Sequence, residues 1–158
     1  MSAARAPGHW LLKSEPEAFS LDDLKAAPKR TDHWDGIRNY QARNFMRDEM
    51  NKGDLAFFYH SNCPEPGIVG IVRIVREAYP DHTAFDPDSP YFDPKSDPSS
   101  PRWVMVDVRY QRRLKRTVTL AEMKAAPELE GFDLLRKGNR LSILPVAARY
   151  WEAVLALE

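Results

Sequence analysis

The sequence has only one cysteine, Cys63, among its 158 residues. One thiol cannot form an internal disulfide, and it cannot supply the paired ligands of the usual structural zinc sites. The chain also has no apolar run long enough to cross a bilayer, and residues 1–8 lack the apolar core of a signal peptide. These absences exclude a disulfide scaffold, indicate no membrane partner, and predict a protein inside the cell that is cytoplasmic, or nuclear if eukaryotic.

An excess of charge of either sign is missing too, because 23 lysines and arginines balance 23 aspartates and glutamates. A neutral total charge gives no sign of a nucleic-acid partner, so any such binding would need a local basic surface. Apolar residues at 43% and charged residues at 29% are typical of a globular protein. We predict a single domain over residues 9–158, preceded by a disordered tail over residues 1–8.

Short runs of apolar, aromatic and β-branched residues predict strands, whereas capping motifs and helical spacing predict helices. The predicted strands cover residues 9–14, 55–59, 67–75, 103–110 and 141–144. The predicted helices follow capping boxes at Ser20 and Thr119 and cover residues 40–50, 129–137 and 147–157. This order of elements predicts an α+β domain, built on a curled mixed sheet or small barrel with short flanking helices.

Residues 79–103 differ from the rest of the chain, because they hold six of the 13 prolines together with five aspartates. Loops of this length are uncommon in compact domains and are usually functional or disordered. The aromatic residues between the prolines, such as Tyr91 and Phe92, give the segment apolar groups to pack with. We therefore predict an ordered, irregular loop that folds over the sheet.

Trp34 opens the segment Trp34-Asp-Gly-Ile-Arg-Asn39, for which two interpretations are open. A lone tryptophan is most often part of the core. Here, however, the turn dipeptide Asp35-Gly36 and the donors Arg38 and Asn39 follow it, so an aromatic face and polar groups meet at one bend. Stacking a base on an aromatic ring contributes roughly 1–3 kcal/mol, and an amide can read the edge of the base. The segment is therefore a candidate site for a planar ligand.

Two predicted strands end in hydrogen-bonding side chains, in Phe58-Tyr-His-Ser-Asn62 and in Lys13-Ser-Glu-Pro16. The simpler interpretation is a polar turn after each strand. Alternatively, if the two strand ends are neighbours, they form the wall of one pocket, with Ser61 and Asn62 facing the ligand. The sequence alone leaves both interpretations open.

Catalytic interpretations have weaker support. Cys63 follows His60 by three residues, but a nucleophile and its base normally come from distant segments, and no third residue orients this base. Asp81 with Asp93-Pro-Lys95 is similar to the magnesium-binding signature of a nuclease superfamily, but Pro94 cannot donate to the strand which that signature requires. The four histidines lack metal-ligand spacing, so we predict no metal site, no cofactor and no catalytic residue.

Basic residues gather in two runs, and such runs are most often solvated charged edges. If they lie beside the pocket, they supply phosphate contacts despite the neutral total charge. The expected phosphate contacts are Arg43, Arg112, Arg113 and Arg140.

Six segments, in order along the chain, resemble the motifs of the EVE domain family. They are Lys13-Ser-Glu-Pro16, Trp34-Asp-Gly-Ile-Arg-Asn-Tyr-Gln-Ala-Arg-Asn-Phe45, Phe58-Tyr-His-Ser-Asn62, Tyr79-Pro-Asp81, Tyr91-Phe-Asp-Pro-Lys-Ser96 and Arg140-Leu-Ser142. The resemblance covers residues 9–157, and the long block from Trp34 to Phe45 is too particular to arise by chance. One variation is visible, at Ile37, where many relatives have Val.

The resemblance implies a PUA-like fold, kinship with the YTH readers of methylated adenine, and binding of a modified base, especially 5-modified cytosine in DNA, without catalysis. Carried over position by position, it implies a pocket lined by Ser14, Trp34, Arg38, Asn39, His60, Ser61 and Asn62, with Tyr79 or Trp103 completing an aromatic cage.

Modified RNA as the ligand remains open. The alternatives are a nuclease-like enzyme acting through Asp35, Asp81 or residues 93–95, and a binder of a small planar metabolite. A reader would pass its signal to an effector protein or act by occupancy alone.

Overall fold

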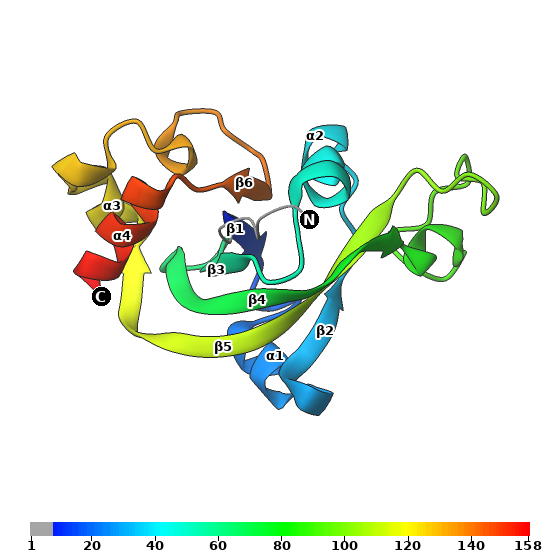
Figure 1. Ribbon diagram of the computed structural model, residues 1–158, viewed down its shortest axis with the longest axis horizontal. Coiled ribbons are helices and arrows are strands. Elements are labelled where there is room, and N and C mark those ends of the chain that lie inside the picture. The colour runs from blue at the N-terminus through cyan, green and yellow to red at the C-terminus, as the bar shows by residue number, and fades with distance from the viewer. Residues whose placement is uncertain (1–7) are drawn as a thin grey trace, which may run out of the picture.

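The structure is a computed structural model that describes residues 8–158. Six strands form one mixed sheet in the order β2-β5-β4-β3-β1-β6 (Figure 1). The strands are β1 (His9–Ser14), β2 (Thr31–Trp34), β3 (Leu55–His60), β4 (Gly67–Pro80), β5 (Val104–Thr119) and β6 (Ile143–Pro145). Neighbouring strands are antiparallel, except for the parallel pair β1 and β3. The predicted α+β fold on a curled mixed sheet is confirmed; within residues 8–158 the edge strands β2 and β6 do not pair, so the sheet is not a closed barrel.

Short helices flank the sheet, and both predicted capping boxes are present. Ser20 and Thr119 each accept the N–H of the third helical residue, whose carboxylate accepts the N–H of the cap. The α-helices are α1 (Leu21–Ala26), α2 (Tyr40–Asn44), α3 (Leu120–Ala125) and α4 (Ala148–Leu157). The shorter turns are the π-helical η2 (Phe45–Glu49) and the 3₁₀ turns η1 (Pro28–Arg30), η3 (His82–Phe85), η4 (Pro127–Leu129) and η5 (Asp133–Leu135). None of the helices in residues 8–158 is long and apolar enough to span a bilayer.

Alternation along the strands gives the sheet two apolar faces, each with its own core. Trp10 and Leu12 of β1 belong to the core that includes α1 and α2, whereas Leu11 belongs to the core of the other face. On that second face, the Trp151 ring of α4 stacks on Phe57 of β3 at 3.8 Å between ring centroids. The C-terminal helices thus cover β1, β3 and the adjoining parts of β4 and β5 (Figure 1).

The parallel pairing of β1 with β3 brings the carboxyl ends of both strands to the same edge of the sheet. Ser14 lies opposite His60, and the backbone N–H of Ser61 donates to the carbonyl of Ser14 at 3.0 Å. The two polar strand ends are therefore neighbours, as the second interpretation of these segments required.

The strands β2 and β5 differ most from prediction. β2 was not predicted, because its polar Asp32 and His33 show no strand pattern; it forms by pairing with β5. β5 continues through the basic run as far as Thr119; Leu114 and Val118 of this part are buried, whereas its charged residues are at least partly exposed. Both strands depend on partners that are distant in the sequence.

Other boundaries also differ from prediction. β4 continues to Pro80, so the irregular segment starts later and contains η3. Residues 129–137 form 3₁₀ turns rather than a helix, and residues 40–50 pass from an α-helix into a π-helical turn. The tail predicted over residues 1–8 lies outside the described residues apart from Gly8, whose N–H donates to Asp54 at 2.8 Å.

Candidate functional site

A cavity of about 440 Å³ opens where β1 and β2 end. Its walls include Ser14 and Phe19 from the segment around the end of β1, Trp34 from the end of β2, and Tyr91 from the loop between β4 and β5. Two other hollows, of about 610 and 560 Å³, are larger, but several basic side chains line them. The smaller cavity is the place where aromatic rings and hydrogen-bonding groups meet.

Trp34 belongs to both the core and the cavity. Trp34 is 6% exposed. Its ring packs edge-to-face against Phe58 at 5.5 Å and Phe19 at 6.3 Å between ring centroids. Such packing fixes the plane of the ring on its buried side. The remainder of the side chain lines the cavity. The core interpretation of Trp34 is confirmed, and stacking of a ligand on its ring stays a prediction.

Tyr91 is a second aromatic wall of the cavity and was not among the predicted ligand-binding residues. Its ring lies so close to Gly36 that a Cβ atom added there would be 2.7 Å from the ring. Gly36 also has a φ of +78°, which residues with a side chain rarely adopt. The turn after β2 therefore requires glycine both for its backbone conformation and for the approach of Tyr91.

Replacing Gly36 by alanine is expected to cost about 1–2 kcal/mol through the left-handed backbone alone, and more through displacement of Tyr91. Gly138→Ala is the matched control, because Gly138 has a φ of +81° and an added Cβ would meet nothing within 4 Å. Urea denaturation of both variants gives the difference in their free energies of unfolding. Equal losses would mean that Tyr91 moves aside without cost.

Arg38 does not line the cavity but connects the turn after β2 to the Tyr91 segment. Its guanidinium donates to the carbonyl of Tyr91 at 2.7 and 3.0 Å and to the carboxylate of Asp81 at 3.1 Å. Asp81 is fully buried and also accepts the N–H groups of Gly36 at 2.9 Å and Thr83 at 2.8 Å. Burial alone would raise the pKa of Asp81, but these hydrogen bonds outweigh burial and hold the pKa below its ordinary value.

The loop that carries Tyr91 is closed at its base. The backbone N–H of Asp81 donates to the carbonyl of Trp103 at 3.0 Å. Trp103 is buried, stacks on Tyr40 at 4.9 Å between centroids, and donates its indole N–H to Asp93 at 2.7 Å. Trp103 therefore anchors the loop instead of lining the cavity.

Of the residues predicted to bind the ligand, only Ser14 and Trp34 line the cavity. Asn39 caps α2 by accepting the N–H of Ala42 at 3.0 Å. Tyr79 donates its hydroxyl to Asp107 at 2.5 Å; burial and this hydrogen bond raise the pKa of Tyr79 to about 12. Any contact of Asn39 or Tyr79 with a ligand stays a prediction.

The predicted residues at the end of β3 support the cavity from behind. His60 accepts the N–H of Leu21 through Nε2 at 3.2 Å, at the start of α1. The amide of Asn62 donates to Glu15 at 2.9 Å, and Glu15 itself lines the cavity. His60 and Asn62 thus position neighbouring segments, and their direct role toward a ligand stays a prediction, as does that of Ser61.

Several polar side chains that line the cavity were not predicted, namely Glu15, Asp32, His33 and Asp35. Burial raises the pKa of Asp35, although the nearby His33 acts in the opposite direction. The Nδ1 atom of His33 is buried and has no hydrogen-bond partner within residues 8–158, since the Asp35 carboxylate is 3.6 Å away. Among the residues that line the cavity, His33 Nδ1 is thus one polar atom without a hydrogen-bond partner in the described part of the chain. The available sequence signal for Asp32, His33 and Asp35 was their position within two residues of Trp34.

Lys13 connects this cavity with the basic hollow of about 560 Å³, because it lines both. Burial lowers the pKa of Lys13. The other cations of that hollow are Lys124, Arg136 and Lys137. Arg140, one of the predicted phosphate contacts, is exposed and precedes Ser142, which lines the cavity.

The other predicted phosphate contacts already have partners within the protein. Arg112 forms a two-bond pair with Glu158 at 2.8 and 2.6 Å, which lowers the pKa of Glu158 to about 2. Arg113 pairs with Asp22, and Arg43 donates to a backbone carbonyl of the closed loop at 3.0 Å. Phosphate contacts by these arginines stay predictions.

Comparison with known proteins identifies relatives of the whole chain. The model of the EVE domain matches residues 8–157. Thymocyte nuclear protein 1 of Homo sapiens is 51% identical over 166 residues, covering 95% of this chain and 73% of the relative. The protein of the same name from Gallus gallus is also 51% identical, covering 95% and 68%.

Solved structures, like the sequence relatives, are similar to nearly the whole chain. The human THYN1 protein, crystallised in complex with 5-methylcytosine containing DNA, has a TM-score of 0.90 at 48% identity and covers 95% of this chain and 96% of that chain. A protein from Pseudomonas syringae has a TM-score of 0.89 at 50% identity, covering 94% and 98%. These similarities confirm the PUA-like fold. With a family match over nearly its whole length, the chain belongs to the EVE domain family.

Proposed function

We propose that this protein is a non-catalytic reader that binds one 5-modified cytosine of a nucleic acid in the cavity lined by Trp34 and Tyr91. The observation that carries the proposal is the cavity itself, with aromatic walls at a sharp glycine turn and polar side chains, His33 among them, beside those walls. Its volume of about 440 Å³ lies within the range of ligand pockets. The similarity to the human THYN1 protein, which was solved with 5-methylcytosine containing DNA, supports the choice of base.

The chemistry of the cavity suits cytosine. The exocyclic amino group of cytosine is a donor, and the carboxylates of Glu15, Asp32 and Asp35 are acceptors. Phe19 and Ile37 supply apolar surface for a group on C5. Burying one methyl group stabilises a complex by about 1 kcal/mol, which corresponds to a roughly fivefold preference over unmodified cytosine.

Extrusion of a base from a duplex costs a few kcal/mol, which stacking and hydrogen bonds in the cavity must exceed. The basic hollow that shares Lys13 with the cavity is suited to the phosphates beside the extruded base. Lys124, Arg136 and Lys137 would supply these contacts, together with the predicted Arg140.

The structure gives little support to the nuclease-like alternative. The carboxylate of Asp81 is buried and accepts hydrogen bonds from three residues, Gly36, Arg38 and Thr83, and Asp93 accepts the indole N–H of Trp103. Residues 8–158 contain no group of three or more His, Cys, Asp or Glu side chains arranged to hold a metal ion. Asp81 and Asp93 therefore act as structural acceptors in this proposal.

The proposal also covers the cellular setting. A nucleic-acid ligand fits a location inside the cell, cytoplasmic or nuclear, and the similarity to thymocyte nuclear protein 1 supports it. The domain over residues 9–158 would pass its signal to an effector protein or act by occupying the modified base.

Binding to matched oligonucleotides tests the proposal. Fluorescence anisotropy with labelled duplexes and single strands of one sequence, carrying cytosine or 5-methylcytosine, is expected to show a roughly fivefold preference for the methylated strand. Parallel RNA oligonucleotides separate DNA from RNA as the ligand. Equal binding to all members would contradict the proposal. Binding of free 5-methylcytidine without salt dependence would instead indicate a small planar metabolite.

A further inference from the structure

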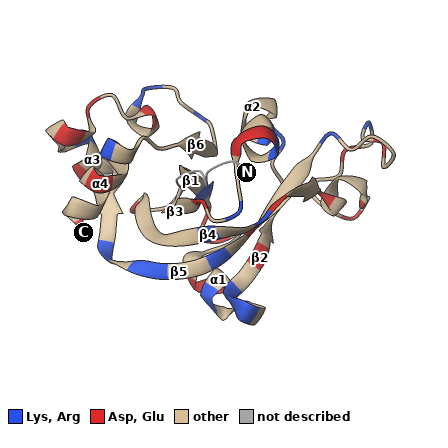
Figure 2. Ribbon diagram, in the orientation of Figure 1, with Lys and Arg blue, Asp and Glu red and all other residues tan. Residues whose placement is uncertain are grey.

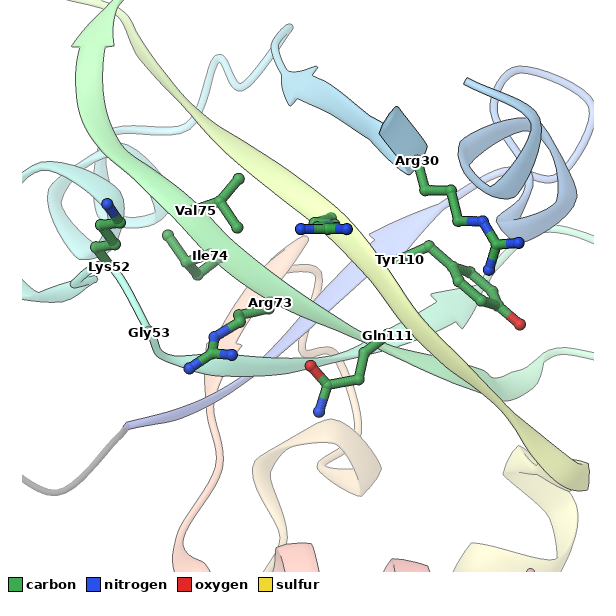
Figure 3. Close-up of a pocket in the computed structure, with 9 residues that line it drawn as sticks. Arg30, Lys52, Gly53, Arg73, Ile74, Val75, Tyr110 and Gln111 are labelled. Atoms are coloured by element: carbon green, nitrogen blue, oxygen red, sulfur yellow. The ribbon is translucent and has the colours of Figure 1, made fainter. Parts of the chain in front are cut away.

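A hollow of about 610 Å³ extends across β4 and β5 near the start of β2 (Figure 3). We call it the basic groove; four cationic side chains line it, those of Arg30, Lys52, Arg73 and Arg109. Figure 3 shows Arg73 between Lys52 at one end and Arg30 beside Tyr110 at the other. The same region of β5 and the neighbourhood of α1 are marked by basic residues in Figure 2.

Two of these cations face each other on neighbouring strands of the sheet. Arg73 of β4 is directly opposite Arg109 of β5 in the antiparallel register. Like charges in this position lie about 5 Å apart at Cβ and destabilise the pair. Within residues 8–158, none of the four cations of the basic groove has a carboxylate within ion-pair distance; one acid reaches the rim, where Glu77 accepts the backbone N–H of Lys52 at 3.1 Å. The fold thus maintains an uncompensated positive groove.

No part of the second core covers this groove. That core contacts β4 only as far as Ile71 and β5 only from Leu114 onward, so the face with Arg73 and Arg109 lies beyond it. At the edge, Arg30 lies over the ring of Tyr110 at 5.6 Å from the centroid, which limits the freedom of its guanidinium. The groove is therefore open, concave and partly preorganised, and these properties suit a polyanion.

β2 connects the basic groove with the base cavity. Thr31, next to Arg30, pairs with Arg109, and Trp34 ends the same strand. Three strand steps span about 10 Å, which is about three base-pair steps along B-DNA. We infer that the basic groove binds the phosphodiester backbone of the nucleic acid about three nucleotides from the base in the cavity. The distance rests on the proposed function, whereas the phosphate binding does not.

The double variant Arg73→Gln/Arg109→Gln tests the inference. Its affinity for methylated and unmodified duplexes is expected to fall equally, by about tenfold at moderate salt, and the slope of log affinity against log salt to fall by about 2. Lys115→Gln/Arg149→Gln removes the same charge from exposed positions outside all three hollows and is expected to leave the slope unchanged. Thermal denaturation serves as the folding check, and the midpoint of R73Q/R109Q should match or exceed that of wild type, because a like-charge pair is removed.

An unchanged salt slope in R73Q/R109Q would overturn the inference, and so would a loss confined to the methylated duplex. A slope lowered equally in both double variants would also overturn it, since total charge rather than the groove would then explain binding. If wild type fails to distinguish methylated from unmodified DNA, the proposed function fails, yet the slope measured on unmodified duplex still decides whether the groove binds phosphates.

Discussion

Trp34→Ala is expected to lower the free energy of unfolding by about 3–5 kcal/mol, in addition to abolishing the preference for a modified base. The ring is buried against Phe58 and Phe19, so alanine leaves a void in the core beside the cavity. Small domains have total stabilities of about 5–15 kcal/mol, and the loss is a large part of that. Urea denaturation followed by circular dichroism measures it.

Trp34→Phe separates the two roles of the residue. Phenylalanine keeps an aromatic ring and fills more of the void, so the stability loss should be smaller while binding is still weakened by the smaller stacking surface. Phe92→Ala removes an aromatic residue from the loop that is 40% exposed, and its stability should stay within about 0.5 kcal/mol of wild type. A Trp34→Ala protein as stable as wild type would refute the assignment of the ring to the core.

Asp81→Ala is expected to destabilise the protein by about 3 kcal/mol, because it removes the acceptor of several donors and leaves the partly buried Arg38 without its carboxylate. Without the Asp81 carboxylate, Arg38 is no longer fixed, and the Tyr91 segment should move away from Gly36. Limited proteolysis between residues 86 and 102 is the measure of that movement. Asp88→Ala, an exposed position in the same loop, is the control.

The effect of Asp81→Ala should depend on pH. Since the pKa of Asp81 is lower in the folded protein than in the unfolded chain, its stabilisation is present above about pH 4 and is lost as the pH falls through the folded pKa. The difference between wild type and variant should therefore shrink in acid. A constant difference from neutral to acidic pH would show that the carboxylate charge contributes nothing.

The features that could be predicted from the sequence are those determined by interactions between residues close together in the chain. The capping boxes at Ser20 and Thr119, the strand ends at Ser14 and His60, and the Trp34 turn were visible because each involves neighbouring residues with a distinctive pattern. The resemblance to the EVE domain family implied the PUA-like fold, but not the strand β2 or the full extent of β5.

Features that depend on distant partners were not predictable. Tyr91 lies 53 residues from Arg38, and only the folded loop places its ring on Gly36. The basic run of β5 looked uniform in the sequence, yet Arg112 is paired with Glu158, 46 residues away, whereas Arg109 faces Arg73. No pattern within the run distinguishes a paired arginine from an unpaired one, because strand register decides it.

The hydrogen bond between Asp81 and Trp103 has a consequence for how base preference can change. It joins the ends of the loop at the sheet, and the residues between them contribute one wall, Tyr91, to the cavity; we call them the loop module. Substitutions, insertions or deletions within this module alter that wall while the strands keep their register. Exchange of residues 86–102 between EVE domains is therefore a direct route to engineered readers with new base specificity on an unchanged scaffold.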